Sequence, residues 1–325
     1  MESTGQARNA QSRQPVVMRS KLMLEAASEL VGSAAWQERQ VRIDFRVQGA
    51  PDWEIRFFAS DAPNSIDEVA SGRADIAICN PGAVLGMALH GAAPFGEPIP
   101  VRAIFVLPQF DQFAFAVKAD TGITSLADIR DRKYPLRVSL RGQRDHSVHL
   151  VANKVLEVYG YSFDDIERWG GVVRLDDEFP NGPNRIEAVA RGEIDAVWDE
   201  ALGMFGTRAL DLGMRFLPVD EPQLQQLEGM GLRRVAIPKD AYPTLPADVW
   251  TVDFSGWPVF CLESTPDAIV TAFCAAVEAR KANVPWYGEG PMDLKAMVSD
   301  TREAPMTIPL HPAARRFWEQ QGYLR

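Results

Sequence analysis

Long apolar runs are missing from this sequence of 325 residues. It contains no stretch of about 20 apolar residues, the length that a membrane-spanning helix needs. Met1–Gln14 is polar, and no apolar segment of signal-peptide type follows Arg8 and Arg13. As written, the chain is therefore expected to be cytoplasmic and not embedded in a membrane. A periplasmic location is expected instead if a leader peptide has been removed.

Cysteine is scarce, and basic residues do not cluster. The three cysteines, Cys79, Cys261 and Cys274, form no CxxC pair and lie in apolar segments, which favours small buried side chains. The net charge of −10 argues against nucleic acid as a partner, because a phosphate backbone requires a basic surface. GxSxG, P-loop and HExxH motifs are also missing. His146 and His149 have helical spacing, but no ligand obviously completes a metal site, so neither metal nor cofactor is expected.

One helix-to-strand unit spans Asn184–Glu200. Its apolar residues have helical spacing, Gly192 can end the helix in a left-handed conformation, and Asp195–Trp198 has the pattern of a short buried strand. A similar unit spans Ile66–Asn80. Five residues recur at a constant displacement of 120 positions: Ile66, Val69, Ala70, Gly72 and Asp75 match Ile186, Val189, Ala190, Gly192 and Asp195. This agreement in register predicts two similar α/β lobes, with the ends of both strands facing a shared cleft.

The rest of the chain can be divided around these units. We expect a disordered tail at residues 1–14, a first lobe formed by 15–117 plus 236–325, and a second lobe formed by 118–235. Two crossings between the lobes would form a flexible double hinge, suited to closure on a ligand. Near the N-terminus, Ser20 is predicted to cap a helix at Lys21–Val31. Its buried stripe would consist of Leu22, Leu24, Ala27 and Leu30.

Several segments resemble known binding proteins. Val117–Ile129 is similar to the segment that enters the second lobe of type-II periplasmic solute-binding proteins. The chain resembles the TAXI subfamily, the substrate receptors of TRAP-type transporters, over roughly residues 60–325. The segments that carry this resemblance are Val155–Gly160, Gly192–Ala196, Ile237–Tyr242, Asp248–Val252 and Ile308–Gly322, the last containing Leu310-His-Pro-Ala-Ala314. The resemblance implies an α/β two-lobed fold of the type-II periplasmic-binding-protein kind, with a ligand cleft between lobes joined by two hinge crossings.

The sequence departs from that subfamily at three turns. Gly142–Val148 keeps only the first glycine of a glycine-rich turn, Asp61–Ser65 replaces a Gly-Ser-x-x-Asn-like turn, and Met18–Lys21 replaces a glycine-rich opening. The resemblance therefore implies the fold more strongly than it implies the ligand.

The loop Arg141–Ser147 is the main candidate site, because free N–H groups at a helix start favour an anion. Arg141 or Arg144 could clamp a carboxylate; alternatively, the loop is a polar turn in which His146 caps the helix. Asp199 and Glu200 could accept hydrogen bonds from ligand hydroxyl or amino groups, or could cap the next helix. Phe110 and Phe113 could stack on a ligand ring or belong to the core. The predicted ligand-binding set is Asn80, Arg141, Gln143, Arg144, His146, Ser147, Asp199 and Glu200.

Two functions follow from these residues. In the first, the protein binds a small organic acid in the interlobe cleft, as a TAXI/TRAP-type receptor that serves a membrane permease if exported, or as a cytoplasmic derivative. In the second, it is a cytoplasmic lyase, a decarboxylase or dehydratase of a cyclic or aromatic carboxylic acid. His146 and Asp145 would then perform the proton transfer.

Overall fold

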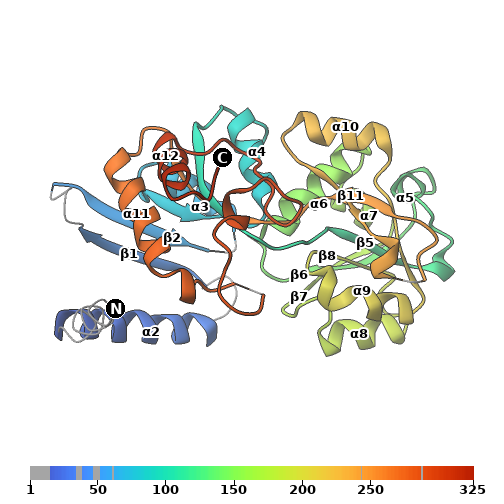
Figure 1. Cartoon of the computed structure of the whole chain (residues 1–325). Coiled ribbons are helices and arrows are strands. Elements are labelled where there is room, and N and C mark those ends of the chain that lie inside the picture. The colour runs from blue at the N-terminus through green and yellow to red at the C-terminus, as the bar shows by residue number, and fades with distance from the viewer. Residues whose placement is uncertain (1–14, 34–38, 47–51, 61, 243, 287) are drawn as a thin grey trace.

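The computed structural model describes residues 15–33, 39–46, 52–60, 62–242, 244–286 and 288–325. The tail expected at residues 1–14 lies outside these ranges. Within the described ranges, the chain forms two α/β lobes placed side by side, each built on a five-stranded sheet (Figure 1). The two-lobed fold predicted from the sequence is confirmed.

The sheet of the first lobe combines strands that are far apart in the sequence. Its strand order is β1 (Val41–Arg46), β2 (Glu54–Ala59), β3 (Ile76–Ile78), β12 (Trp257–Leu262) and β4 (Val101–Leu107). β2 and β3 run parallel and are joined through helix α3 (Asn64–Ala70), whereas β12 is antiparallel to β3 and β4. Helices α4 (Gly82–His90), α11 (Asp267–Ala279) and α12 (Pro312–Gln320) also belong to this lobe.

The C-terminal motif anchors the last helix on this sheet. His311 precedes α12, and its Nδ1 accepts a hydrogen bond from the Ala313 amide at 3.2 Å. The indole N–H of Trp318 donates to the carbonyl of Ile104 in β4 at 2.9 Å. Both residues are buried, so in this fold the motif has a structural role.

The sheet of the second lobe is continuous over the middle of the chain. Its strand order is β7 (Val172–Asp176), β6 (Arg137–Arg141), β8 (Ala196–Asp199), β5 (Ala114–Lys118) and β9 (Met214–Phe216). Its described α-helices are α5 (Leu126–Asp131), α6 (Ser147–Val158), α7 (Phe163–Arg168), α8 (Pro183–Ala190), α9 (Leu202–Asp211) and α10 (Glu221–Gly229). Strand β5 corrects one expectation, because residues up to 117 were assigned to the first lobe but β5 pairs with β8 and β9.

The two connections between the sheets run next to each other. The Phe254 amide donates to the Asp111 carbonyl at 3.0 Å, and the Gly256 amide donates to the Gln109 carbonyl at 2.9 Å. A two-stranded ribbon of β10 (Arg234–Ile237) and β11 (Val249–Val252) leads into the second connection. We call residues 108–113 and 253–256 the crossing segments.

Both helix–glycine–strand units form as predicted. Gly72 follows α3 with a φ of 70°, and Gly192 follows α8 with a φ of 69°. These left-handed conformations suit glycine, because a Cβ atom would strain the backbone there. In each unit, a strand begins directly after an aspartate, β3 after Asp75 and β8 after Asp195.

Two glycines bring the lobes into direct backbone contact. Gly86 lies in α4 of the first lobe, and Gly231 follows α10 of the second. A Cβ atom on Gly86 would lie 2.3 Å from the Gly231 carbonyl oxygen, and one on Gly231 would lie 2.4 Å from the Gly86 carbonyl carbon. Larger residues at either position would force the helix and the turn apart.

Helix α2 (Pro15–Ser33) differs from the expectation at its start and in its packing. Ser20 lies inside the helix instead of capping it, and the predicted buried stripe is wrong because Leu22, Leu24 and Leu30 are 65%, 49% and 69% exposed. Its apolar residues are spread around the helix, so they cannot all face the sheet, and α2 lies beside β1 and β2 (Figure 1). Among the described residues, none of the helices has the length and apolar character needed to cross a membrane.

Candidate functional site

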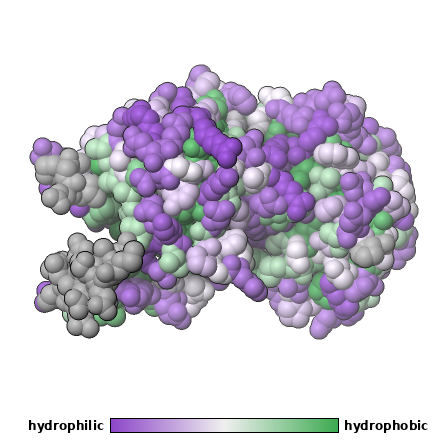
Figure 2. All heavy atoms as spheres, in the orientation of Figure 1, coloured by the Kyte–Doolittle hydropathy of each residue, from purple (hydrophilic) through white to green (hydrophobic). Residues whose placement is uncertain are grey.

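A cavity of about 520 Å³ lies where the two lobes and the crossing segments meet. The space-filling view shows a notch between the lobes, with a mainly hydrophilic surface around it (Figure 2). Strand ends, the starts of helices and loops supply the lining side chains. They are Arg39, Asn80, Gln109, Phe110, Asp111, Arg141, His146, Phe179, Glu200, Ala201, Gly203, Met204 and Trp257. We call this space the interlobe cavity.

Arg141 ends strand β6 and is the centre of a buried ion network. Its Nη2 lies 2.7 Å from Asp199 Oδ1 and 2.5 Å from Glu200 Oε1. Asp199 is fully buried and also pairs with Arg185 Nη1 at 2.7 Å. Burial by itself would lower the pKa of the Arg141 guanidinium, but the charges of Asp199 and Glu200 outweigh burial and raise it. Arg141 is therefore held in place by the protein's own carboxylates.

His146 caps helix α6, as the alternative interpretation of the loop predicted. Its Nδ1 accepts from the Val148 amide at 3.2 Å, and its Nε2 lies 3.1 Å from Arg141 Nη1. Burial, followed by the charge of Arg141, lowers the pKa of His146 well below its usual value, so the ring is neutral at pH 7. Asp145 is exposed, and none of the described hydrogen bonds joins it to His146. The acid–base pair required by the lyase hypothesis is not assembled in this structure.

The structure brings only some of the predicted site residues together. Asn80, Arg141, His146 and Glu200 line the interlobe cavity. Asp199 lies behind Arg141, and Ser147 contacts the wall through a hydrogen bond to the Asn80 carbonyl. Gln143 is buried but is not part of the lining, whereas Arg144 is exposed and lines a different hollow with His149. Of the two arginines proposed as clamps, only Arg141 faces the interlobe cavity.

Sequence reasoning missed Gln109 and Asp111 of the first crossing segment, and it left open whether Phe110 and Phe113 contact a ligand or belong to the core. Gln109, Phe110 and Asp111 all line the cavity, whereas Phe113 is fully buried in the core. The expected lobe boundary between residues 117 and 118 lies beyond Gln109 and Asp111, so neither was expected at the crossing. Arg39 carried no recognisable signal, because it follows an N-terminal helix with no motif.

Asp111 links the crossing segment to the second lobe. Its carboxyl oxygens accept from the Ala201 amide at 2.9 Å and the Leu202 amide at 3.1 Å, at the start of α9. Burial, followed by the nearby charge of Glu200, raises the pKa of Asp111 well above its usual value. Asp111 therefore keeps its proton to a higher pH than an ordinary aspartate does, which reduces the negative charge of this wall.

Two amide oxygens in the cavity wall have unused hydrogen-bonding capacity. Asn80 Oδ1 and Gln109 Oε1 are buried and have no hydrogen-bond partner among the described residues. A buried acceptor without a partner costs free energy. Such groups suit a ligand that donates hydrogen bonds.

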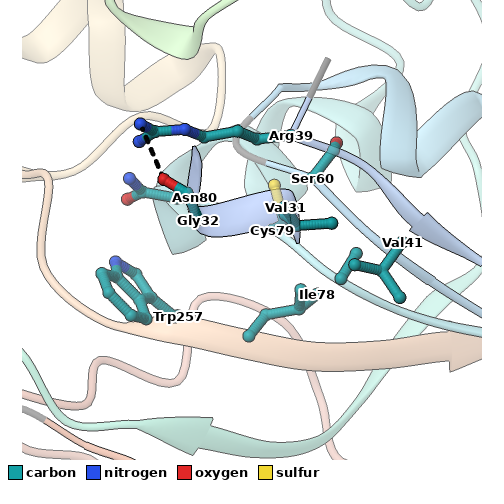
Figure 3. A pocket seen from close by; sticks show the side chains of 10 residues that line it. Val31, Gly32, Arg39, Val41, Ser60, Ile78, Cys79, Asn80 and Trp257 are labelled. Atoms are coloured by element: carbon teal, nitrogen blue, oxygen red, sulfur yellow. Dashed lines mark hydrogen bonds between the residues drawn. The ribbon is translucent and has the colours of Figure 1, made fainter. Parts of the chain in front are cut away.

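A second cavity of about 290 Å³ lies in the first lobe, next to the interlobe cavity (Figure 3). It is lined by Val31, Gly32, Arg39, Val41, Ala59, Ser60, Ile78, Cys79, Asn80 and Trp257. Arg39, Asn80 and Trp257 line both cavities. Arg39 Nη2 donates to the Gly32 carbonyl at 3.4 Å. We call this space the first-lobe cavity.

Two sheet-based lobes with a polar cavity at their junction define the class of two-lobed solute-binding folds. The chain belongs to the NMT1-like family, whose sequence model matches residues 53–322.

Solved structures with similarity to this chain share little sequence with it. The alkanesulfonate-binding protein SsuA from Xanthomonas axonopodis pv. citri, bound to MOPS, is 15% identical, with a TM-score of 0.31 and coverage of 68% of this chain and 62% of its own. A protein described as a periplasmic transporter is 15% identical, with a TM-score of 0.37 and 81% of both chains covered. A TctC solute-binding protein from Polaromonas is 15% identical, with a TM-score of 0.33 and coverage of 62% and 63%.

Proposed function

We propose that this protein binds a small organic acid in the interlobe cavity, as a solute receptor of the TAXI/TRAP type or a derivative of one. The observation that carries the proposal is a cavity of about 520 Å³ to which both lobes and a crossing segment contribute polar side chains. Its volume lies within the roughly 300–1,000 Å³ of typical small-molecule sites. Closure of the lobes about the crossing segments would enclose the ligand.

The charges of the wall favour an acid that also donates hydrogen bonds. Arg39 and Arg141 contribute two guanidinium groups, and each has five N–H donors with which to bind a carboxylate beside its protein partners. Glu200 and the amide oxygens of Asn80 and Gln109 can accept from ligand hydroxyl or amino groups. Phe110 and Phe179 offer apolar surface between these polar groups. A hydroxy or amino acid of modest size fits this combination.

We further propose a cellular role in solute transport, which membership of the NMT1-like family supports. We place the protein in the periplasm, where it would deliver its ligand to a membrane permease. Fractionation of the native host, followed by sequencing of the mature N-terminus, tests this location. Recovery of the protein only from the cytoplasm would contradict it and favour a cytoplasmic derivative.

Isothermal titration against dicarboxylates, keto acids, hydroxy acids and aromatic acids tests the ligand class. We expect at least one acid to bind with a micromolar Kd, and Arg39→Met to weaken that affinity at least tenfold because it removes a guanidinium from the wall. Arg144→Met is the matched control, since Arg144 is exposed and lines another hollow. Failure of every acid to bind more tightly than millimolar would overturn the proposal.

A further inference from the structure

We propose that the ligand is amphipathic, with its carboxylate end in the interlobe cavity and an apolar tail in the first-lobe cavity. This inference rests on the proposed function and adds a second compartment to the same site. Arg39, Asn80 and Trp257 line both cavities, and Figure 3 shows these three side chains in the wall of the first-lobe cavity. A ligand that enters the interlobe cavity therefore has a neighbouring space into which a tail can extend.

The lining of the first-lobe cavity is suited to hydrocarbon. Val41, Ala59 and Ile78 come from three strands of the first sheet, and Val31 comes from the end of α2. The hydroxyl group of Ser60 is engaged within its own turn, where it donates to Asn64 Oδ1 at 2.7 Å. Beyond the three shared residues, the described lining thus offers little that a polar group could bind.

Cys79 adds to this apolar lining. Its side chain is fully buried, and burial raises the pKa of the thiol to about 12. The side chain is therefore neutral at physiological pH and behaves as a small apolar group. Apart from Arg39 at the junction, the described lining of this cavity offers an anionic ligand end no charged partner, so the ligand is oriented with its charge in the interlobe cavity.

The volume of the first-lobe cavity sets the size of the tail. At about 290 Å³, it has roughly twice the volume of the engineered apolar cavity of about 150 Å³ that stays dry and binds benzene. A phenyl group on a short alkyl linker, or a comparable aliphatic chain, fits this space. The polar junction at Arg39 and Asn80 then lies where the tail joins the head group.

Titration with benzoate, phenylacetate, 3-phenylpropanoate and 4-phenylbutanoate tests the inference. Burial of each added methylene is worth about 0.8 kcal/mol, which is about fourfold in affinity. We expect the Kd to fall by about 50-fold from benzoate to 4-phenylbutanoate. Succinate, glutarate and adipate are the control series, because lengthening them moves a second carboxylate toward the first-lobe cavity instead of an apolar group. Their affinities should not rise with chain length. Equal affinity across the phenyl series would overturn the inference.

Ala59→Phe locates the tail, because the larger side chain fills the first-lobe cavity. We expect the affinity ratio between 4-phenylbutanoate and benzoate to fall below about fivefold in this variant, given the loss of methylene burial. Ala275→Phe, at an exposed position of α11, is the control and should keep the full ratio. Val41→Phe replaces Ala59→Phe if circular dichroism shows that the latter is unfolded. If the cavity-filling variant kept the full affinity ratio, the inference would be overturned, but acid binding in the interlobe cavity would stand. If no acid bound at all, the proposed function itself would be overturned.

Discussion

The hydroxyl group of Ser147 donates a hydrogen bond to the backbone carbonyl of Asn80. Ser147 is the first residue of α6 in the second lobe, and Asn80 follows β3 in the first. The bond therefore joins the two lobes beside the interlobe cavity. It holds the start of α6 near the end of β3.

Ser147→Ala should weaken ligand binding about fivefold. The variant removes a hydrogen bond worth about 1 kcal/mol from the arrangement in which the lobes are close together. Isothermal titration with the acid that binds most tightly measures the loss. Ser71→Ala is the control, because the Ser71 hydroxyl also donates to a carbonyl but does so locally, on the surface of the first lobe. Equal affinities for the two variants would show that the Ser147 bond has no part in binding.

Arg141→Met should destabilise the protein by about 3–5 kcal/mol, because it leaves Glu200 without its guanidinium partner and Asp199 with only Arg185. Arg144→Met should change the free energy of unfolding by no more than about 0.5 kcal/mol, as expected for an exposed side chain. Urea unfolding followed by circular dichroism gives both values. Similar losses of unfolding free energy in the two variants would contradict a stabilising role for the buried ion network of Arg141.

Asp75 and Asp195 perform the same task in the two lobes. Asp75 Oδ2 accepts from the Arg56 amide and Nε at 2.9 and 3.1 Å, and Asp195 Oδ2 accepts from the Arg137 amide and Nε at 3.1 and 2.9 Å. We expect Asp75→Asn and Asp195→Asn each to cost about 1–2 kcal/mol, because each weakens charge-assisted bonds to a partly exposed arginine. The two losses should add in the double variant, since the sites share no partner. Urea unfolding measures the free energy of unfolding of the two single variants and of the double variant. If only one single variant lost stability, the aspartate–arginine pair of the other lobe would have no stabilising role.

The carboxyl group of Asp111 should make the free energy of unfolding depend on pH. The raised pKa of Asp111 means that the folded state binds a proton more tightly than the unfolded state. Its contribution is therefore fully present below its ordinary pKa of 3.8 and is lost as the pH rises through the raised value. The lowered pKa of His146 acts in the opposite direction, with stability rising up to its ordinary pKa of 6.5.

Glu200→Gln tests the contribution of Asp111, because it removes the charge that lies beside this carboxyl group. Urea unfolding at a series of pH values from 4 to 8 should show a smaller loss of stability with rising pH in Glu200→Gln than in the wild type. The size of the difference reports how strongly the two carboxyl groups are coupled. Parallel pH profiles would contradict the coupling.

The repeated units show how far local sequence reaches. Helical spacing, a glycine with positive φ and a short apolar strand could all be predicted at Ile66–Asn80 and Asn184–Glu200. Each of these features depends only on residues that are close together in the sequence. The ion pairs of Asp75 and Asp195 could not be predicted from the sequence. Their partners, Arg56 and Arg137, lie on neighbouring strands and are 19 and 58 residues away in the chain.

The residues of the candidate site also divide into those that the sequence could predict and those that it could not. Arg141, His146 and Glu200 could be placed near a cleft because they follow strands or precede a helix in the predicted fold. Arg144 was indistinguishable from Arg141 by residue type, and only the direction of its side chain removes it from the interlobe cavity. Asp111 could not be recognised, because its value as a helix cap depends on α9, which begins 91 residues later.

By itself, the sequence determined that this protein has two related α/β lobes and that polar residues lie at their strand ends, because periodicity and turn chemistry are local properties. Only the tertiary structure decided which of those side chains share a cavity, that Arg141 is neutralised by Asp199 and Glu200, and that an apolar space opens beside the polar one. These features arise where segments from both lobes meet, and their energetics depend on burial and on distances between residues far apart in the chain.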